Sequence, residues 1–184
     1  MNGLTLSERY GEVRRRVAEA AARSGRSERD VLLVAVTKYA EPEDIRTLME
    51  LGHEDFGENR VQQLGQRAAM AAEWLDRVRV LDRTGQGRGD GDRPGLDPAK
   101  PPRWHMIGHL QRNKARKVVD HVRLIHSVDS LRLAEELQTL LRKTDRRLDV
   151  LLQVNIAGED QKSGCLPAAA PAMAEQIDSM YSLR

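Results

Sequence analysis

The sequence predicts a parallel α/β fold, either a (β/α)8 TIM-type barrel or an open doubly wound sheet. Five short apolar runs alternate with longer segments whose apolar residues recur at helical spacing, so each predicted strand is followed by a helix. No Gly-x-Gly-x-x-Gly motif follows the first strand, which argues against a dinucleotide-binding sheet. Polar residues without a core explanation come directly after the strands. In a barrel these positions converge on one face, so we expect a single site there.

Composition is typical of one globular domain, and we expect residues 1–184 to form it. The net charge of +2 and the 3% aromatic content argue against a nucleic-acid or membrane partner. The single cysteine, Cys165, excludes an intrachain disulfide and suits a reducing compartment. No apolar run approaches the roughly 18 residues of a membrane helix, and the N-terminus has no signal-peptide core, so we expect a cytoplasmic protein.

The first predicted strand is the apolar run 31–36, which continues into Thr37 and Lys38. Six apolar residues without polar alternation are typical of a parallel strand that is covered on both faces. Burying the ammonium group of Lys38 at the end of this strand without a partner costs roughly several kcal/mol of free energy, so burial favours the neutral amine. A neutral amine is a nucleophile that forms an imine with an aldehyde. The alternative is that Lys38 extends from the strand end into solvent.

Helices are predicted on both sides of this strand. Before it, Ser7 is the expected cap of a helix that Gly25 ends, with Tyr10, Val13, Val17 and Ala21 on its apolar face. After it, Pro42 begins a helix that runs to about Leu51. A short strand over 53–58 leads to Asn59, the expected cap of a long amphipathic helix, with Gln62 completing a capping box. The apolar stripe of that helix is Val61, Leu64, Ala68, Ala71 and Leu75.

The stretch 82–102 interrupts the pattern, because nine of its 21 residues are Gly or Pro. It is interpreted as a flexible surface insertion, since the alternation resumes afterwards. Three further strands are predicted over 104–107, 123–128 and 149–156. Helices follow them: one ending near Asp120, one capped by Ser130, and one over about 167–181.

Eight polar residues near predicted strand ends are candidates for the site: Lys38, Asn59, His105, His109, Ser127, Asp129, Asn155 and Lys162. Several have a simpler explanation. Asn59 is equally suited to helix capping, His105 to a hydrogen-bonded place in the core, Ser127 to a turn and Asn155 to a strand end. His109, His121 and His126 have no metal-ligand spacing. The basic run formed by Arg112, Lys114, Arg116 and Lys117 is interpreted mainly as a solvated helix face, with phosphate or RNA contact as the alternative.

Five ordered motifs resemble the pyridoxal phosphate homeostasis protein family: the segments 34–38, 55–62, 104–114, 125–129, and 153–156 with 162–164. The resemblance implies a single-domain barrel of the alanine racemase N-terminal type. It also implies that pyridoxal 5′-phosphate is held as an imine on Lys38, and that the protein carries and buffers the cofactor without turning over a substrate. The other expected cofactor contacts are Asn59, His105, Ser127 and Asn155.

In the family, further βα units supply the phosphate loops and the arginine that faces the pyridine nitrogen. This chain has about five βα units, so it is expected to be truncated at the C-terminus. Its first and fifth strands are then expected to be exposed sheet edges, and it is expected to bind the cofactor weakly. Two other classes stay open. One is a pyridoxal phosphate-dependent amino-acid racemase, which needs a second proton-transfer group. Tyr39 is expected to point away from Lys38 if the strand continues. The other is a nucleic-acid or protein-binding module that uses the basic residues. Enzymes that accept pyridoxal phosphate are the expected protein partners of a carrier.

Overall fold

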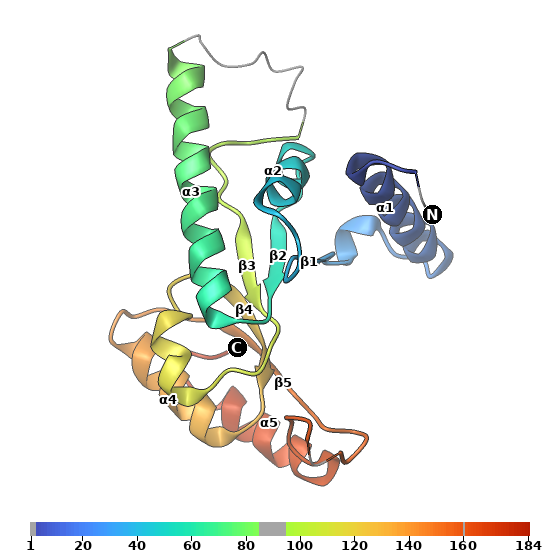
Figure 1. Cartoon of the computed structure of the whole chain (residues 1–184). Coiled ribbons are helices and arrows are strands. Elements are labelled where there is room, and N and C mark those ends of the chain that lie inside the picture. Colours follow the sequence, from blue (N-terminus) through green and yellow to red (C-terminus); the bar gives the residue numbers. More distant parts are fainter. Residues whose placement is uncertain (1–2, 85–94, 160) are drawn as a thin grey trace. The chain divides into compact units, whose positions relative to one another are not determined.

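The structure is a computed structural model that describes residues 3–84, 95–159 and 161–184 (Figure 1). The chain divides into two compact units. The first consists of Met1–Phe56 with Met70–Pro102, and the second of Gly57–Ala69 with Arg103–Arg184. Within the described residues no helix is long and apolar enough to cross a membrane.

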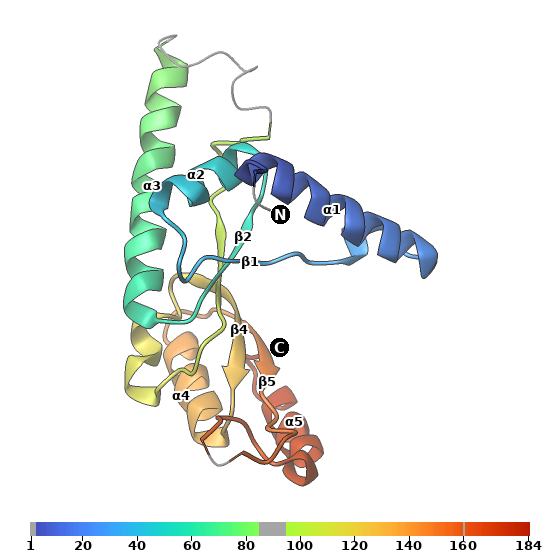
Figure 2. The ribbon, with the colours of Figure 1, turned by 45° about the vertical axis from the view of Figure 1, so that its right-hand side comes forward.

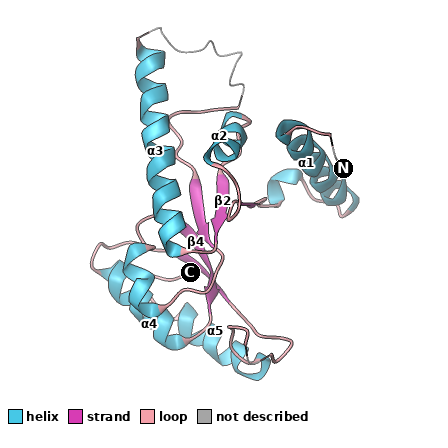
Figure 3. Cartoon of the chain, viewed as in Figure 1, coloured by secondary structure: helices cyan, strands magenta, loops and turns pink. Residues whose placement is uncertain are grey.

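Five strands are neighbours in chain order, from β1 to β5. They are β1 (Ala35–Val36), β2 (Asp55–Glu58), β3 (Arg103–Met106), β4 (Val122–Val128) and β5 (Asp149–Leu152). The pair β3 and β4 is parallel, with Met106 opposite Ile125, and the pair β4 and β5 is parallel, with Ile125 opposite Val150. Helices follow the strands along the chain (Figure 3). The predicted α/β class with parallel strands is therefore confirmed.

The first unit contains α1 (Leu6–Arg23), η1 (Glu28–Asp30), α2 (Pro42–Glu50) and the later turns of α3 (Val61–Arg83). The helix α1 contacts α2 and η1, and α2 buries Ile45, Leu48 and Met49. Pro42 is the first residue of α2, as predicted. The predicted cap of α1 is wrong: Thr5 rather than Ser7 is the N-cap, because Thr5 and Glu8 form a reciprocal capping box.

The strand that carries Lys38 is shorter and more exposed than predicted. Only Ala35–Val36 forms β1. Two residues of the predicted strand are largely exposed: Leu32 at 49% and Val36 at 55%. The expectation of a fully buried strand is wrong for these residues. The reason is that β1 lies at the end of the strand order, where a strand has a neighbour on one side only among the described elements.

The second unit contains the first turns of α3, then η3 (Arg112–Lys117), α4 (Leu131–Arg142), η4 (Pro167–Ala169) and α5 (Ala170–Asp178). The helix α4 buries Leu133, Leu137 and Leu141 and contacts β4, η3 and α5. Figure 2 shows α4 in orange and α5 in red near the strands β4 and β5. Ser130 occupies the N-cap position of α4, as predicted, but its side chain makes no capping hydrogen bond there.

The edge of β5 is partly paired, contrary to the expectation of a bare fifth strand. Leu148 forms a parallel bridge with Leu183. The amide of Leu148 donates to the carbonyl of Ser182 at 2.9 Å, and the amide of Val150 donates to the carbonyl of Arg184 at 2.8 Å. The segment 182–184 thus satisfies backbone groups that would otherwise face solvent.

The predicted insertion over 82–102 is described only at its two ends, and its central residues lie outside the described part of the chain. Asp82 and Arg83 are the last residues of α3. After the gap, the amide of Gly95 donates to the carbonyl of Glu50 at 3.0 Å. The guanidinium Nε of Arg79 donates to the carbonyl of Pro98 at 2.7 Å. These bonds tie the described residues of the second end to the first unit.

Candidate functional site

Lys38 lies two residues beyond β1 and is half-buried. Its Nζ atom lies 5.1 Å from the centre of the Tyr39 ring. Among the residues that the structure describes, Lys38 forms no salt bridge, so no carboxylate holds its ammonium group. Partial rather than full burial leaves the amine accessible to a soluble aldehyde. The side chain therefore suits a reversible covalent attachment point.

The relation between Lys38 and Tyr39 depends on where β1 ends. Consecutive residues of a strand point to opposite faces, so Tyr39 was expected to point away from Lys38 if the strand continued. The strand ends at Val36, however, and a turn follows in which the amide of Ala40 donates to the carbonyl of Thr37 at 2.9 Å. The turn brings the ammonium over the ring, an arrangement worth about 0.5–1 kcal/mol at an exposed site. Tyr39 itself is 87% exposed.

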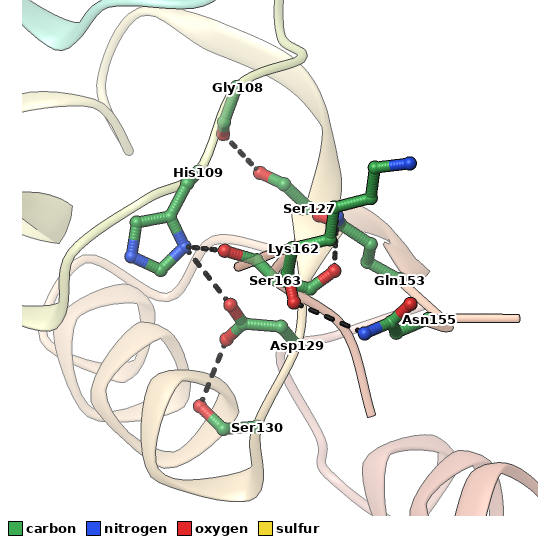
Figure 4. Close-up of polar contacts among 9 residues, drawn as sticks. All are labelled: Gly108, His109, Ser127, Asp129, Ser130, Gln153, Asn155, Lys162 and Ser163. Carbon is green, nitrogen blue, oxygen red and sulfur yellow. Dashed lines mark hydrogen bonds and ion pairs between the residues drawn. The ribbon is translucent and has the colours of Figure 1, made fainter. Parts of the chain in front are cut away.

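A second group of polar residues gathers at the carboxyl ends of β3, β4 and β5 in the second unit (Figure 4). Ser127, the next-to-last residue of β4, donates from its hydroxyl to the carbonyl of Gly108 at 2.6 Å. This bond links the end of β4 to the loop after β3. The hydroxyl of Ser127 is thereby engaged with the backbone, and the side chain is 1% exposed.

His109 is the centre of this group. Its Nδ1 atom lies 3.1 Å from Oδ2 of Asp129 and 3.0 Å from Oγ of Ser163. A proton on Nδ1 is donated to the carboxylate, which orients the ring and leaves Nε2 outside this contact. Both partners share one nitrogen, whereas a catalytic Ser-His-Asp triad needs the serine and the acid on opposite nitrogens. The arrangement therefore orients the imidazole and is unsuited to acyl transfer.

The loop after β5 places Ser163 in this group. The side-chain amide of Asn155 donates to the carbonyls of Glu159 and Lys162 at 2.9 and 3.3 Å. Gln153 donates from Nε2 to the carbonyl of Ser163 at 2.9 Å. Gly164 has a φ of +132°, and a Cβ atom there would lie 2.6 Å from the amide nitrogen of Asn155. Only glycine fits this close approach.

His105 lies on β3, in the interior of the second unit. Its side chain is fully buried, and its Nδ1 lies 2.9 Å from Nε2 of His126 on β4. Burial lowers the pKa of His126, and the neighbouring His105 lowers it further. The pair is a hydrogen-bonded core contact between β3 and β4.

Asn59 lies between β2 and α3, which begins at Val61, so Arg60 rather than Asn59 directly precedes the helix. Asn59 lines a half-open cavity of about 810 Å³ in the second unit. The wall formed by the start of α3 includes Arg60 and Gln62, and the opposite wall includes His109, Lys114 and Lys117. A Cβ atom at Gly108 would lie 2.2 Å from the carbonyl oxygen of Asn59, which shows how closely the loops after β2 and β3 pass.

The structure thus brings together the side chains of Ser127, Asn155, His109 and Asp129 at the ends of β3, β4 and β5 (Figure 4). Lys162 joins them only through its backbone carbonyl, since its amine pairs with Glu159. Gln153 and Ser163 also belong to this group but were not among the candidates, although both lie inside motifs that the sequence had marked. The signal that could have identified Ser163 is its position directly before Gly164, where the chain needs glycine to make a close turn.

Comparison with known proteins gives a consistent result. The family model described as "Alanine racemase, N-terminal domain" matches residues 10–184. The pyridoxal phosphate homeostasis protein of Pseudomonas aeruginosa is 34% identical over 181 residues, which are 98% of this chain and 67% of that protein. The protein of the same name from Escherichia coli is 32% identical over 179 residues, which are 97% of this chain and 67% of that protein.

Among solved structures, that of PipY from Synechococcus elongatus with pyridoxal phosphate bound aligns with a TM-score of 0.63 and 31% identity. The alignment covers 91% of this chain and 66% of PipY. The chain therefore spans about two thirds of the length of the relatives that it matches. The five strands correspond to part of a barrel of the alanine racemase N-terminal type, which confirms the expected fold.

Proposed function

Because this chain belongs to the pyridoxal phosphate homeostasis protein family, with an alanine racemase N-terminal domain, we propose that it binds pyridoxal phosphate through Lys38. The observation that carries the proposal is the half-buried Lys38 amine, which forms no salt bridge within the described residues. When bound, pyridoxal phosphate supplies an aldehyde that condenses with a primary amine to an imine and releases water. The similarity to PipY, solved with pyridoxal phosphate bound, supports the same ligand.

The proposed cofactor residues have different tasks. Lys38 holds the aldehyde carbon, and Asn59 hydrogen-bonds the cofactor at the end of β2. Ser127 and Asn155 hold the backbone of the loops around the site in place, since their side chains donate hydrogen bonds to backbone carbonyls at 2.6 and 2.9 Å. His105, hydrogen-bonded to His126, links β3 to β4. Ser127, Asn155 and His105 are thus positioning residues in this proposal.

The proposed role is to carry and buffer the cofactor without turning over a substrate, with pyridoxal phosphate-dependent enzymes as recipients. A racemase needs a second proton-transfer group on the face of the substrate opposite the first. The nearest tyrosine, Tyr39, has its ring beneath the Lys38 ammonium and is largely exposed, so it does not support that role. We also propose that residues 1–184 belong to one pyridoxal phosphate-binding domain, with 82–102 as its insertion, and that the protein is cytoplasmic.

Borohydride reduction tests the attachment point. The chain is incubated with pyridoxal phosphate, reduced, digested and mapped by mass spectrometry. We expect the label on Lys38 and its loss in Lys38→Ala, while Lys143→Ala, which removes an exposed lysine at the end of α4, keeps it. Equal labelling of many lysines, or an unchanged labelling pattern in Lys38→Ala, would overturn the proposal.

A further inference from the structure

The cavity formed by the start of α3 and by the loop and helix after β3 is lined by positively charged side chains. Its lining includes the three cations Arg60, Lys114 and Lys117, together with His109 and His121. No aspartate or glutamate is among the described residues that line it. Four side-chain amides, including those of Gln66 and Gln111, complete the polar part of its wall.

Three carboxylates on or near the elements that form the cavity are each engaged in an ion pair. Glu58 at the end of β2 pairs with Arg67, and Asp129 pairs with Nδ1 of His109. Asp120, after η3, pairs with Arg146 at 2.9 Å. In the described part of the chain, Arg60, Lys114 and Lys117 form no salt bridge. Three positive charges therefore face the cavity without a counter-charge from the protein.

Two further features favour an anion there. The first N–H groups of α3, which begins at Val61, have no acceptor within the helix, and the positive end of its dipole lies at this wall. In addition, His109 uses Nδ1 for Asp129 and Ser163, so its Nε2 atom remains to meet a ligand. Charge-assisted hydrogen bonds from such groups recognise phosphate oxygens.

The geometry of η3 explains why only some of the basic residues face the cavity. A 3-10 helix has three residues per turn, so Lys114 and Lys117 lie one above the other. Ala115 and Val118, one position further on, are fully buried. Arg112 and Arg116 are exposed and are absent from the cavity lining.

We propose that this cavity binds the phosphate group of a small phosphorylated molecule, through Arg60, Lys114, Lys117 and the start of α3. Its volume of about 810 Å³ falls within the range of small-molecule sites and far exceeds one phosphate, so the ligand carries an organic part that contacts the amides. Asn59, which the proposed function assigns to the cofactor, is among the lining residues, whereas Lys38 is not, so the proposal is tested with a probe that forms no imine.

Binding of adenosine 5′-monophosphate tests this inference, because that probe carries a phosphate monoester but no aldehyde. Calorimetric titration of the whole chain is compared with adenosine, and inorganic phosphate is added as a competitor. We expect adenosine 5′-monophosphate to bind more tightly than adenosine, and inorganic phosphate to displace it. Amide resonances of residues at the start of α3 and in η3 are expected to shift in the unaltered protein.

A matched pair of double variants locates the site. Lys114→Gln with Lys117→Gln is expected to weaken binding by about a hundredfold, since each lost charged hydrogen bond lowers affinity about tenfold. Arg112→Gln with Arg116→Gln removes the same charge from the same helix outside the cavity and is expected to change affinity less than about twofold. Lys38→Ala is expected to leave binding unchanged, which separates this site from the proposed imine site.

Four outcomes would overturn the inference. The first is an equal loss of affinity in both double variants, which would indicate attraction by the overall positive charge. The second is equal affinity for adenosine and adenosine 5′-monophosphate, and the third is the absence of resonance shifts at a millimolar concentration of the probe. The fourth is loss of adenosine 5′-monophosphate binding in Lys38→Ala. Steeply salt-dependent binding of single-stranded RNA that needs Arg112 and Arg116 as much as the two lysines would instead indicate a nucleic-acid surface.

Discussion

Gly108 lies where the loop after β3 passes the end of β2. Its replacement by alanine tests how closely the backbones of these two segments approach each other. A Cβ atom there would lie 2.2 Å from the carbonyl oxygen of Asn59 and 2.7 Å from its Cα atom. Both are backbone atoms, so neither rotates away as the end of a side chain does. Overpacking of this kind costs about 1–3 kcal/mol.

The same substitution disturbs a hydrogen bond. The carbonyl of Gly108 accepts the hydroxyl of Ser127 at 2.6 Å, and a shift of the loop weakens that bond, whose net value is about 0.5–1.5 kcal/mol. Gly108→Ala is therefore expected to lower the free energy of unfolding by about 1.5–4.5 kcal/mol. Against a total of about 5–15 kcal/mol, such a loss is large.

Urea titration followed by circular dichroism measures this change from the shift of the midpoint. Gly11→Ala is the matched control, because Gly11 lies inside α1 and no heavy atom would come within 4 Å of its new Cβ. That control is expected to raise the free energy of unfolding by about 0.5–1 kcal/mol. If Gly108→Ala were as stable as the unaltered protein, the close approach of the two loops would be refuted.

Two other substitutions probe a buried charge and a half-buried histidine. Arg67→Met removes the Arg67 guanidinium from its ion pair with the fully buried Glu58 and is expected to cost about 3–5 kcal/mol in urea titration. Recovery of stability when Glu58→Gln is added would support this cause, and an unchanged stability of the single variant would contradict it. Burial, aided by His105, lowers the pKa of His126 in the folded state, so the unfolded chain binds more protons in mild acid. The contribution of His126 to the free energy of unfolding is thus complete above about pH 6.5 and is lost as the pH falls below it. Between about pH 7 and 5, His126→Gln is expected to flatten the slope of the free energy of unfolding against pH, whereas His121→Gln, at an exposed position, is expected to leave it unchanged. An unchanged slope in His126→Gln would exclude His126 as its source.

Much of the fold could be predicted because helices and strands leave local patterns. Leu133, Leu137 and Leu141 recur at helical spacing and form the buried face of α4. Pro42 at the first position of α2 is similarly local. The boundaries were less certain, since Thr5 and Ser7 are both capping residues and only the bond to Glu8 decides between them.

The candidate site could be predicted only as a set of residues near strand ends. Whether Asn155 contacts a ligand or closes its own loop depends on where the carbonyls of Glu159 and Lys162 lie, which spacing does not give. Likewise, the position of Tyr39 relative to Lys38 depends on where β1 stops. An apolar run does not mark that point, because the length of a strand depends on its neighbours.

The sequence by itself determined the alternation of strands and helices, the position of Lys38 just after the first strand, and the family motifs. Tertiary structure alone decided which polar groups meet. His109 reaches Asp129 across 20 positions and Ser163 across 54. The three-residue turn of η3 separates Lys114 and Lys117 from the other basic residues around them. The physical reason is that propensity and periodicity act within a few residues, whereas these contacts depend on the register of parallel strands that are joined by long connections.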